Sequence, residues 1–173
     1  MTDLSEVAIN AATPDDAATL GNLLELYIHD LSQIFSLDVG RDGRFGYEKL
    51  PLYWSEPERR FPFLIQCGAK IVGFALVTRG SPASDNSEDF DVAEFFILRR
   101  YRRSGVGRRA AVLLWNHFPG RWIVRVSEGN PNAYHFWTSV IDEYTGSVFA
   151  ETSRAGNPFA WLVFSFNSAS PGS

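Results

Sequence analysis

A basic loop with two glycines lies near the centre of the sequence, in the run Arg102-Arg103-Ser104-Gly105-Val106-Gly107-Arg108. An apolar run with strand character ends just before it at Leu98, and an apolar pattern with helical spacing begins near Val106. Glycine lets a backbone approach a ligand closely, and the first turn of a helix offers free N–H groups with a partial positive charge. A strand, a glycine loop and a helix start in this order predict a binding site for a phosphorylated ligand.

Charged residues around this loop are grouped by sign. Six arginines lie between Arg99 and Arg109. A basic region beside an acidic one is typical of a site that brings an anionic and a cationic ligand together. A solvated surface with clustered charges gives the same pattern. The acidic stretch that precedes the arginines contains Asp85, Glu88, Asp89, Asp91 and Glu94.

Glu94 is a charged residue inside the apolar run that begins at Val92. Apolar residues occupy both the odd and the even positions of that run, so we expect both faces of the strand to be buried. Burial of a carboxylate is costly without a partner and raises its pKa, which suits a general base near neutral pH. A structural ion pair with one of the arginines is the alternative, and the sequence favours neither.

Hydrophobic periodicity predicts alternating strands and helices around these motifs. Thr13-Pro14 marks a helix start, Pro119-Gly120 a helix end, and Asn130-Pro131 the start of another helix. The helix after the glycine loop connects two strands, which should therefore lie parallel and adjacent. The expected strands cover residues 7–11, 61–66, 71–78, 91–98, 121–126, 148–151 and 159–166, and the expected helices cover residues 14–33, 47–54, 106–118 and a segment from 131 onwards.

The segment 35–60 has no clean period, is broken by glycines and prolines, and is rich in aromatic residues. Long irregular segments in compact domains are often functional. We therefore expect this segment to shape a wall of an acceptor pocket. Its Tyr47 and Trp54, together with Tyr27 from the preceding helix, are the candidate substrate-binding residues. Ordinary aromatic packing explains any one of them equally well.

Length and composition narrow the kind of protein. The 173 residues suffice for one compact domain, expected over residues 1–166 and followed by a flexible tail at 167–173. A net charge of −4 argues against general nucleic-acid binding, and the single cysteine, Cys67, excludes an intrachain disulfide and a multi-cysteine metal site. No apolar run approaches about 20 residues and no secretory signal is visible, so we expect a cytoplasmic protein that does not bind membranes.

Two motifs resemble those of the GNAT acyltransferase superfamily. Arg102, Gly105 and Gly107 match its signature Gln/Arg-x-x-Gly-x-Gly/Ala. The run Asn130-Pro131-Asn132-Ala133, followed by Phe136-Trp137, matches its Asn-x-x-Ala motif with a downstream aromatic pair. The motifs cover residues 90–140, and the order of elements extends the resemblance to nearly the whole chain. It implies an α/β fold of the α+β kind, with a mixed sheet of about six to seven strands, about four helices, and parallel strands that splay apart at the acyl-CoA site.

The resemblance implies an acyl-CoA donor, usually acetyl-CoA, and no metal. Its pyrophosphate would lie on the backbone N–H groups of the glycine loop, where arginine side chains would help to neutralise it. Side chains added at the two loop glycines are expected to enter this site. The residues implied in donor binding are Phe96, Ile97, Leu98, Arg102, Arg103, Ser104, Gly105, Val106, Gly107, Arg108, Asn130, Ala133 and Trp137.

The reaction implied is direct attack of an amine on the thioester. A backbone N–H near Leu98 would stabilise the oxyanion, and Glu94 would take the proton of the amine. Many family members have a tyrosine at the position of Trp137, and an indole N–H cannot act as a proton-transferring acid. Tyr134, one turn earlier, is the substitute candidate for protonating the thiolate, and departure of the thiolate with solvent help is the alternative.

The leading functional hypothesis is an N-acetyltransferase acting on a primary amine of a small molecule or peptide. A catalytically weak acyl-CoA-binding regulatory module is the alternative, motivated by Trp137. A polyanion binder that uses the arginine cluster is a third hypothesis, which the acidic net charge disfavours. The expected partners are therefore the amine substrate and no nucleic acid or membrane, and the resemblance also allows a homodimer.

Overall fold

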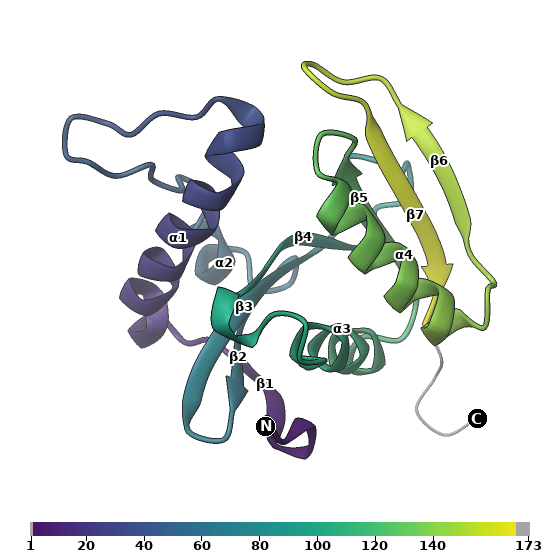
Figure 1. Ribbon diagram of the computed structural model, residues 1–173, viewed down its shortest axis with the longest axis horizontal. Helices are drawn as coiled ribbons and strands as arrows, with labels where there is room; N and C mark the ends of the chain where they lie inside the picture. Colours follow the sequence, from purple (N-terminus) through teal and green to yellow (C-terminus); the bar gives the residue numbers. More distant parts are fainter. Residues whose placement is uncertain (1, 169–173) are drawn as a thin grey trace.

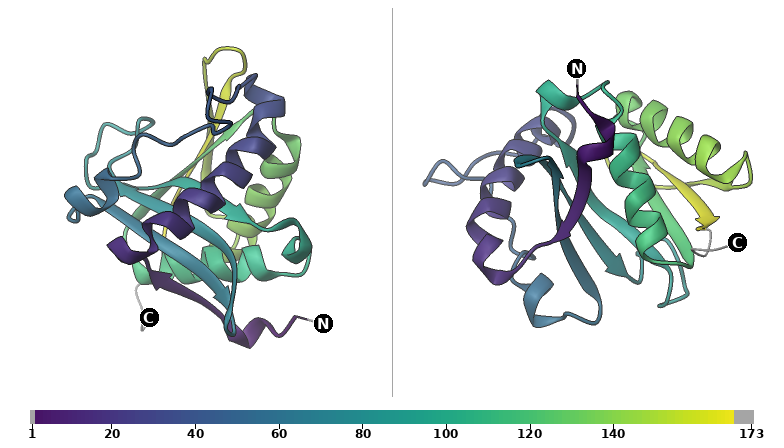
Figure 2. Two further views of the ribbon diagram at one scale, coloured as in Figure 1. Left: turned by 90° about the vertical axis from the view of Figure 1, so that its left-hand side faces the viewer. Right: turned by 90° about the horizontal axis from the view of Figure 1, so that it is seen from below.

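The computed structural model describes residues 2–168, which form one mixed sheet of seven strands with helices on both faces (Figure 1 and Figure 2). The strand order is β1-β2-β3-β4-β5-β7-β6. The strands are β1 Val7–Ala11, β2 Arg60–Cys67, β3 Lys70–Arg79, β4 Phe90–Ile97, β5 Arg121–Ser127, β6 Ala150–Arg154 and β7 Trp161–Asn167. The helices are α1 Ala17–Phe35, α2 Leu52–Ser55, α3 Val106–His117 and α4 Pro131–Thr145, with short 3-10 turns at Leu4–Glu6, Pro14–Asp16 and Arg99–Tyr101. The predicted fold class is confirmed.

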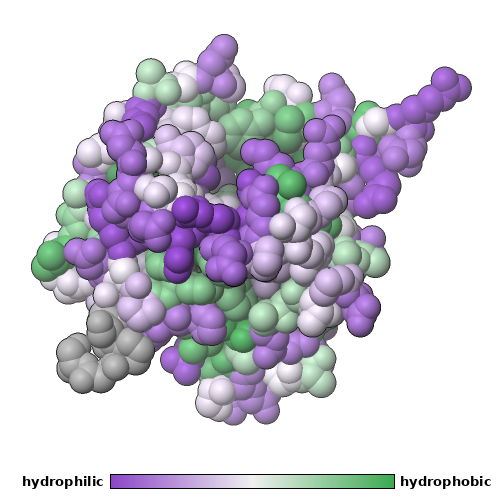
Figure 3. All heavy atoms as spheres, turned by 180° about the vertical axis from the view of Figure 1, so that it is seen from behind, coloured by the Kyte–Doolittle hydropathy of each residue, from purple (hydrophilic) through white to green (hydrophobic). Residues whose placement is uncertain are grey.

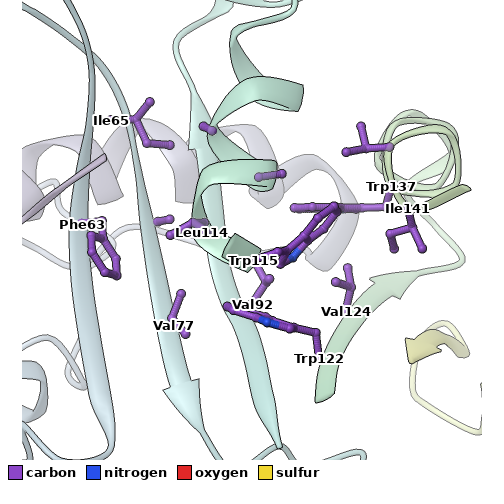
Figure 4. Close-up of a cluster of buried hydrophobic side chains, with 14 of the residues drawn as sticks. Phe63, Ile65, Val77, Val92, Leu114, Trp115, Trp122, Val124, Trp137 and Ile141 are labelled. Atoms are coloured by element: carbon purple, nitrogen blue, oxygen red, sulfur yellow. The ribbon is translucent and has the colours of Figure 1, made fainter. Parts of the chain in front are cut away.

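Each face of the sheet carries its own hydrophobic core. On one face, Leu20 and Leu24 of α1 pack with Phe74 of β3 and Tyr53 of α2. On the other face, α3 and α4 supply a larger core that includes three buried tryptophans, Trp115, Trp122 and Trp137 (Figure 4). Strand side chains alternate between the two cores, so a strand in the middle of the sheet is apolar on both faces, as predicted for β4. Seen from behind, polar residues cover much of the surface, and apolar residues appear there in smaller patches (Figure 3).

The parallel pair β4–β5 is short. Its Cα partners are Phe90 with Trp122 and Asp91 with Ile123, whereas the other paired strands are antiparallel over most of their lengths. Beyond Asp91 the two strands diverge, and the halves of the molecule that carry α1 and α4 separate with them (Figure 1). The predicted parallel arrangement is therefore confirmed, and the divergence opens the centre of the sheet between β4 and β5.

The last two strands lie further along the chain than predicted. β6 pairs with β7 through Arg154, opposite Trp161, and β7 pairs with β5 from Ser127 to Arg121. Every residue of β6 is exposed, so no hydrophobic alternation marked it in the sequence. Asn167 of the predicted tail belongs to β7, and the backbone N–H of Ser168 donates to Gly120 (2.8 Å). The rest of that tail, residues 169–173, lies outside the described residues.

Candidate active site

Glu94 lies on β4 and faces α1. It accepts a hydrogen bond from the hydroxyl of Tyr27 (2.5 Å) and another from the hydroxyl of Tyr47 (3.2 Å). Burial raises the pKa of Glu94 above its ordinary value, and the two tyrosine hydrogen bonds offset part of that effect. No arginine of the described chain forms an ion pair with Glu94, because the nearby Arg125 pairs with Asp91 instead. The structure therefore contradicts the alternative that Glu94 forms a structural ion pair with an arginine.

A β-bulge decides which face of the sheet Glu94 occupies. In the register between β3 and β4, Leu76 lies opposite Glu94 while the next residue, Val77, lies opposite Val92. The extra residue on β4 reverses the alternation of side chains. Val92 therefore joins the core under α3, whereas Glu94 points to α1, as Phe96 does. Without the bulge, the carboxylate would have faced the α3 core.

The two tyrosines reach Glu94 from separate segments. Tyr27 comes from α1, whose entry is fixed by a hydrogen bond from the backbone N–H of Thr13 to the Asp16 carboxylate (2.8 Å). Tyr47 follows a long connection that Glu25 of α1 holds by accepting the backbone N–H groups of Phe45 (2.8 Å) and Gly46 (3.0 Å). Burial and the charge of Glu94 raise the pKa of both tyrosines, so they remain hydrogen-bond donors across the ordinary pH range.

A cavity of about 760 Å³ fills the opening between the diverging strands. Glu94 and both tyrosines line it, as do residues 124–127 of β5 and Asn130, Ala133 and Trp137 at the α4 side. At one end, the rings of Phe35 and Trp161 stack at 6.0 Å, so the end of α1 meets the start of β7. The cavity is thus enclosed by both halves of the molecule and is large enough for a small substrate.

The acidic stretch before β4 does not form a free cation site. Asp91 is fully buried and its two carboxylate oxygens accept from Nε and Nη2 of Arg125, both at 2.9 Å. Ser81 also donates to Asp91 through its hydroxyl. Further along, the buried Asp89 pairs with Arg121 (3.1 Å). These acids are neutralised inside the protein, which corrects the expectation that the whole stretch attracts a cationic ligand.

The start of α3 has the features of an anion site. The helix begins at Val106, and its N-cap is Gly105, with a φ of +88° and without a side-chain hydrogen bond to the helix. The backbone N–H groups in the first turn of a helix have no partner within the helix. No side chain of the described chain caps α3. The backbone N–H groups of Val106, Gly107 and Arg108 therefore remain available to an anionic ligand.

Several arginines near this loop bind other parts of the protein. Arg102 donates from Nε to the Ile97 carbonyl (2.7 Å), and Arg102 and Arg99 each donate to a carboxylate oxygen of Asp30 on α1 (both 2.6 Å). Arg108 pairs with Glu143 of α4. The side chains at 102 and 108 thus contact α1 and α4 while 40% and 41% exposed, and their contact with a pyrophosphate stays a prediction.

The two loop glycines are required for packing as well as for backbone approach. A Cβ atom on Gly105 would lie 2.9 Å from Cδ1 of Leu4, and one on Gly107 would lie 3.2 Å from the ring of Phe136. Side chains added at these positions would first meet neighbours of the loop, and their entry into the phosphate site stays a prediction.

If the first turn of α3 binds the acyl-CoA donor that the sequence motifs imply, replacing Gly105 with Ala is expected to weaken acetyl-CoA binding. A side chain at a φ of +88° strains the N-cap by roughly 1–2 kcal/mol and shifts the first N–H groups of α3. Gly146→Ala is the matched control, since Gly146 has a φ of +60° with open space around it at the far end of α4. Calorimetry should show lower affinity only for the Gly105 variant, although both lose stability. Equal affinities of the two variants for acetyl-CoA would show that the N-cap of α3 is not part of the donor site.

The hairpin register shows which backbone groups of β4 face the opening. The Leu98 N–H donates to the Val72 carbonyl of β3 (2.9 Å), so Leu98 and, by strand alternation, Phe96 point their backbone groups at β3. The backbone groups of Phe95 and Ile97 point the other way, where β5 has moved off, and Arg102 already occupies the Ile97 carbonyl. Phe95 thus replaces Phe96 and Leu98 as the residue with backbone groups open to a ligand.

Two predicted site residues lie away from the cavity. The Tyr134 ring packs near Phe164, and its hydroxyl lies 3.5 Å from the Glu151 carboxylate on β6. The indole N–H of Trp54 donates to the Ala12 carbonyl (3.1 Å), and this ring packs in the α1 core. Neither residue lines the cavity, so the structure does not support Tyr134 as the acid or Trp54 as a substrate contact.

The start of α4 is built as the sequence indicates. The Asn130 side chain accepts from the backbone N–H of Ala133 (3.1 Å), and Pro131 follows at the first helical position. Trp137 is 7% exposed and meets the ring of Phe95 edge to face at 5.0 Å, while Phe95 also stacks with Phe136 at 6.0 Å. These half-buried and buried rings form an apolar wall beside the Phe95 backbone.

Comparison with solved structures identifies the architecture. An acetyltransferase from Thermus thermophilus superposes with a TM-score of 0.70 at 20% identity, covering 96% of this chain and 99% of that one. A spermidine N-acetyltransferase from Vibrio cholerae, solved with CoA and spermine, gives a TM-score of 0.67 at 10% identity over 95% and 96% of the two chains. A protein from Desulfovibrio desulfuricans that is attributed to the GNAT family gives 0.64 at 11% identity over 94% and 99%. The chain has the GNAT fold.

No family model matches the sequence, and no curated protein matches it. The likeness to GNAT structures therefore rests on the fold. Among residues 2–168, none of the helices has the length and apolar character needed to cross a membrane. The same residues contain no group of three or more His, Cys, Asp or Glu side chains placed to hold a metal ion.

Proposed function

We propose that the protein is an acetyl-CoA-dependent N-acetyltransferase that acts on a primary amine of a small molecule or peptide by direct attack. One observation carries the proposal. Glu94, with a raised pKa and two tyrosine hydrogen bonds, lines a cavity at the point where β4 and β5 separate. A base poised nearer neutrality beside an open strand edge suits removal of a proton from an amine.

The residues present fit an acyl-CoA donor. The uncapped first turn of α3 offers N–H groups to the pyrophosphate, and the open backbone carbonyl of Phe95 offers an acceptor to a pantetheine amide. The rings of Phe136 and Trp137 line the same stretch with apolar surface. When bound, acetyl-CoA supplies an activated thioester.

Each residue of the site then has a defined task. The Glu94 carboxylate accepts the proton of the amine, directly or through water, while Tyr27 and Tyr47 hold it in place. The N–H of Phe95, which faces the opening, is placed to stabilise the oxyanion in the role first expected near Leu98. With Tyr134 turned toward β6, the thiolate leaves without a protein acid and takes its proton from water.

Tyr27→Phe is expected to shift the acidic limb of the pH–rate profile to higher pH. The Tyr27 hydroxyl stabilises the ionised form of Glu94 and so lowers its pKa, whereas burial raises it. Without that hydrogen bond, the effect of burial raises the pKa of Glu94 further, and the base titrates at a higher pH than in the wild type. The measurement is kcat/KM against pH with a saturating donor. In Tyr134→Phe, whose hydroxyl lies toward Glu151, the limb should not move, and a shift there would contradict the assignment.

The test of the proposal is release of CoA thiol from acetyl-CoA in the presence and absence of a panel of amines, together with calorimetric binding of acetyl-CoA. An enzyme binds the donor and releases thiol in an amine-dependent manner. Tight binding without turnover on any amine would instead support the acyl-CoA-binding regulatory module, which Trp137 in place of the family tyrosine favours as the second candidate.

A further inference from the structure

A buried tyrosine on the α1 side of the cavity has no hydrogen-bond partner. Tyr53 of α2 is 2% exposed and lines the cavity, yet its hydroxyl makes no hydrogen bond in the described chain. Burial, and next to it the charge of Glu94, raises the pKa of Tyr53 to about 12. The hydroxyl therefore stays protonated. Tyr47 and Arg60 lie close enough to lower its pKa, but its O–H has no acceptor within hydrogen-bonding distance in the described chain and is available to an acceptor on a ligand.

Arg60 lies over the ring of Tyr53, and Glu56 engages only part of its guanidinium. Its Nε donates to Glu56 (2.7 Å), and its guanidinium carbon lies 5.6 Å from the centre of the Tyr53 ring. An arginine bound to a carboxylate through Nε keeps the donors of its two terminal nitrogens. Arg60 lines the same cavity as Tyr53, so the two side chains offer several N–H and O–H donors to one place.

These donors are connected with Glu94 through Tyr47. The Tyr47 hydroxyl donates to Glu94 at 3.2 Å, and Tyr47 and Arg60 both lie near enough to Tyr53 to affect its pKa. The four side chains therefore lie near one another in the lining of the cavity. A ligand beside them meets a proton acceptor at Glu94 and donors at Tyr53 and the positively charged Arg60.

Charge in the cavity as a whole also favours an anionic group on the ligand. Among its lining residues, Arg125 is paired with Asp91, Arg60 with Glu56, and Arg59 and Arg79 share Glu88. Lys49 and one guanidinium charge then remain against Glu94, whose pKa is raised toward the neutral form. A polycation would therefore meet more repulsion than attraction. The lining cations are Lys49, Arg59, Arg60, Arg79 and Arg125, and the lining acids are Glu56 and Glu94.

We propose that the acceptor is a small amine that also carries a carboxylate, with its amine at Glu94 and its carboxylate at the Tyr53 hydroxyl and Arg60. This rests on the proposed N-acetyltransferase function and names the substrate class of that site. In the transfer, the amine nitrogen forms a bond to the acetyl carbon as the C–S bond breaks. One proton of the amine passes to Glu94, and the sulfur leaves as a thiolate that takes a proton from water.

Matched acceptors test the proposal. Thiol release from acetyl-CoA is measured with glycine, β-alanine and 4-aminobutyrate, with the amide of each, and with spermidine. For at least one pair we expect kcat/KM to be about tenfold or more higher for the carboxylate than for the amide, because the amide leaves charged donors without their partner. Spermidine should be a poorer substrate than that carboxylate.

Two variants locate the effect. Arg60→Gln and Tyr53→Phe should each lower kcat/KM for the carboxylate acceptor and leave the value for its amide unchanged, so the ratio falls toward one. Tyr53→Phe keeps the ring that packs in the core and loses only the unpartnered hydroxyl, which makes misfolding an inadequate explanation. An unchanged ratio in both variants would overturn the assignment of the subsite.

The outcomes separate this inference from the proposed function. If amides or spermidine are acetylated as well as the carboxylates, the anionic subsite is wrong while the N-acetyltransferase function stands. If no amine accelerates thiol release, both the proposed function and the proposed substrate class are wrong.

Discussion

Glu94→Gln is expected to lower kcat for amine acetylation by about 10²–10⁴-fold, the usual contribution of general-base catalysis. Glutamine keeps the size of the side chain. Its amide oxygen can accept from one of Tyr27 and Tyr47, and its NH2 group can donate to the hydroxyl oxygen of the other, so the geometry of the cavity is retained. It cannot take a proton from the amine. Affinity for acetyl-CoA, measured by calorimetry, should be nearly unchanged, because the donor groups lie on Phe95 and the first turn of α3.

The same substitution should not weaken the fold. The pKa of Glu94 is raised in the folded protein, so the folded state binds the proton more tightly than the unfolded state does. The stability from this group is present below the unfolded pKa and is lost as pH rises through the folded one. A glutamine side chain does not ionise, so the variant avoids the cost of burying a charge. It should unfold at an equal or higher temperature than the wild type at neutral pH. A wild-type rate in a folded Glu94→Gln variant would remove Glu94 as the base.

Asp91→Ala is expected to cost about 3–5 kcal/mol of unfolding free energy, because it leaves the half-buried Arg125 guanidinium without its partner. Asp91 is 0% exposed and makes two hydrogen bonds to Arg125 at 2.9 Å. It also stands at the last paired position of β4 and β5, where the strands begin to diverge. The pair therefore fixes the origin of the opening that contains Glu94.

Denaturant unfolding measures this cost, and Glu88→Ala is the control. Glu88 pairs with Arg59 and Arg79 at the surface, with 60% of its side chain exposed, and such pairs contribute less than about 1 kcal/mol. Replacing both partners of the buried pair, as Asp91→Ala with Arg125→Met, should recover part of the loss. If Asp91→Ala and Glu88→Ala were equally stable, the buried pair would not be what anchors the splayed strands.

The sequence predicted the features that depend on local patterns. Short apolar runs joined by a turn marked β2 and β3, and Thr13, Asn130 and the glycine loop marked helix starts that the structure contains. The parallel β4–β5 pair followed from the helix between the two strands. Glu94, Tyr27 and Tyr47 were each singled out by type and place, and the structure brings them together through hydrogen bonds.

Features that depend on distant partners were not predictable. Arg102 looked free in the sequence because its partner Asp30 lies 72 residues away. Phe95 was missed because its role depends on the direction of its backbone groups, which only the hairpin register shows. Tyr134 was misplaced because its direction depends on Glu151 in β6, a strand with no apolar alternation. Tyr53 and Arg60 gave no signal beyond their position in an aromatic-rich segment.

Direct transfer with Glu94 as the base is tested most sharply by the products of the reaction. Wild-type protein is incubated with acetyl-CoA and an amine acceptor, and N-acetylated amine and free CoA thiol are quantified together by mass spectrometry and thiol titration. We expect the two products to form in equal amounts and Glu94→Gln to slow both alike. Thiol release without N-acetylated amine, or equal product formation by the variant, would contradict this mechanism.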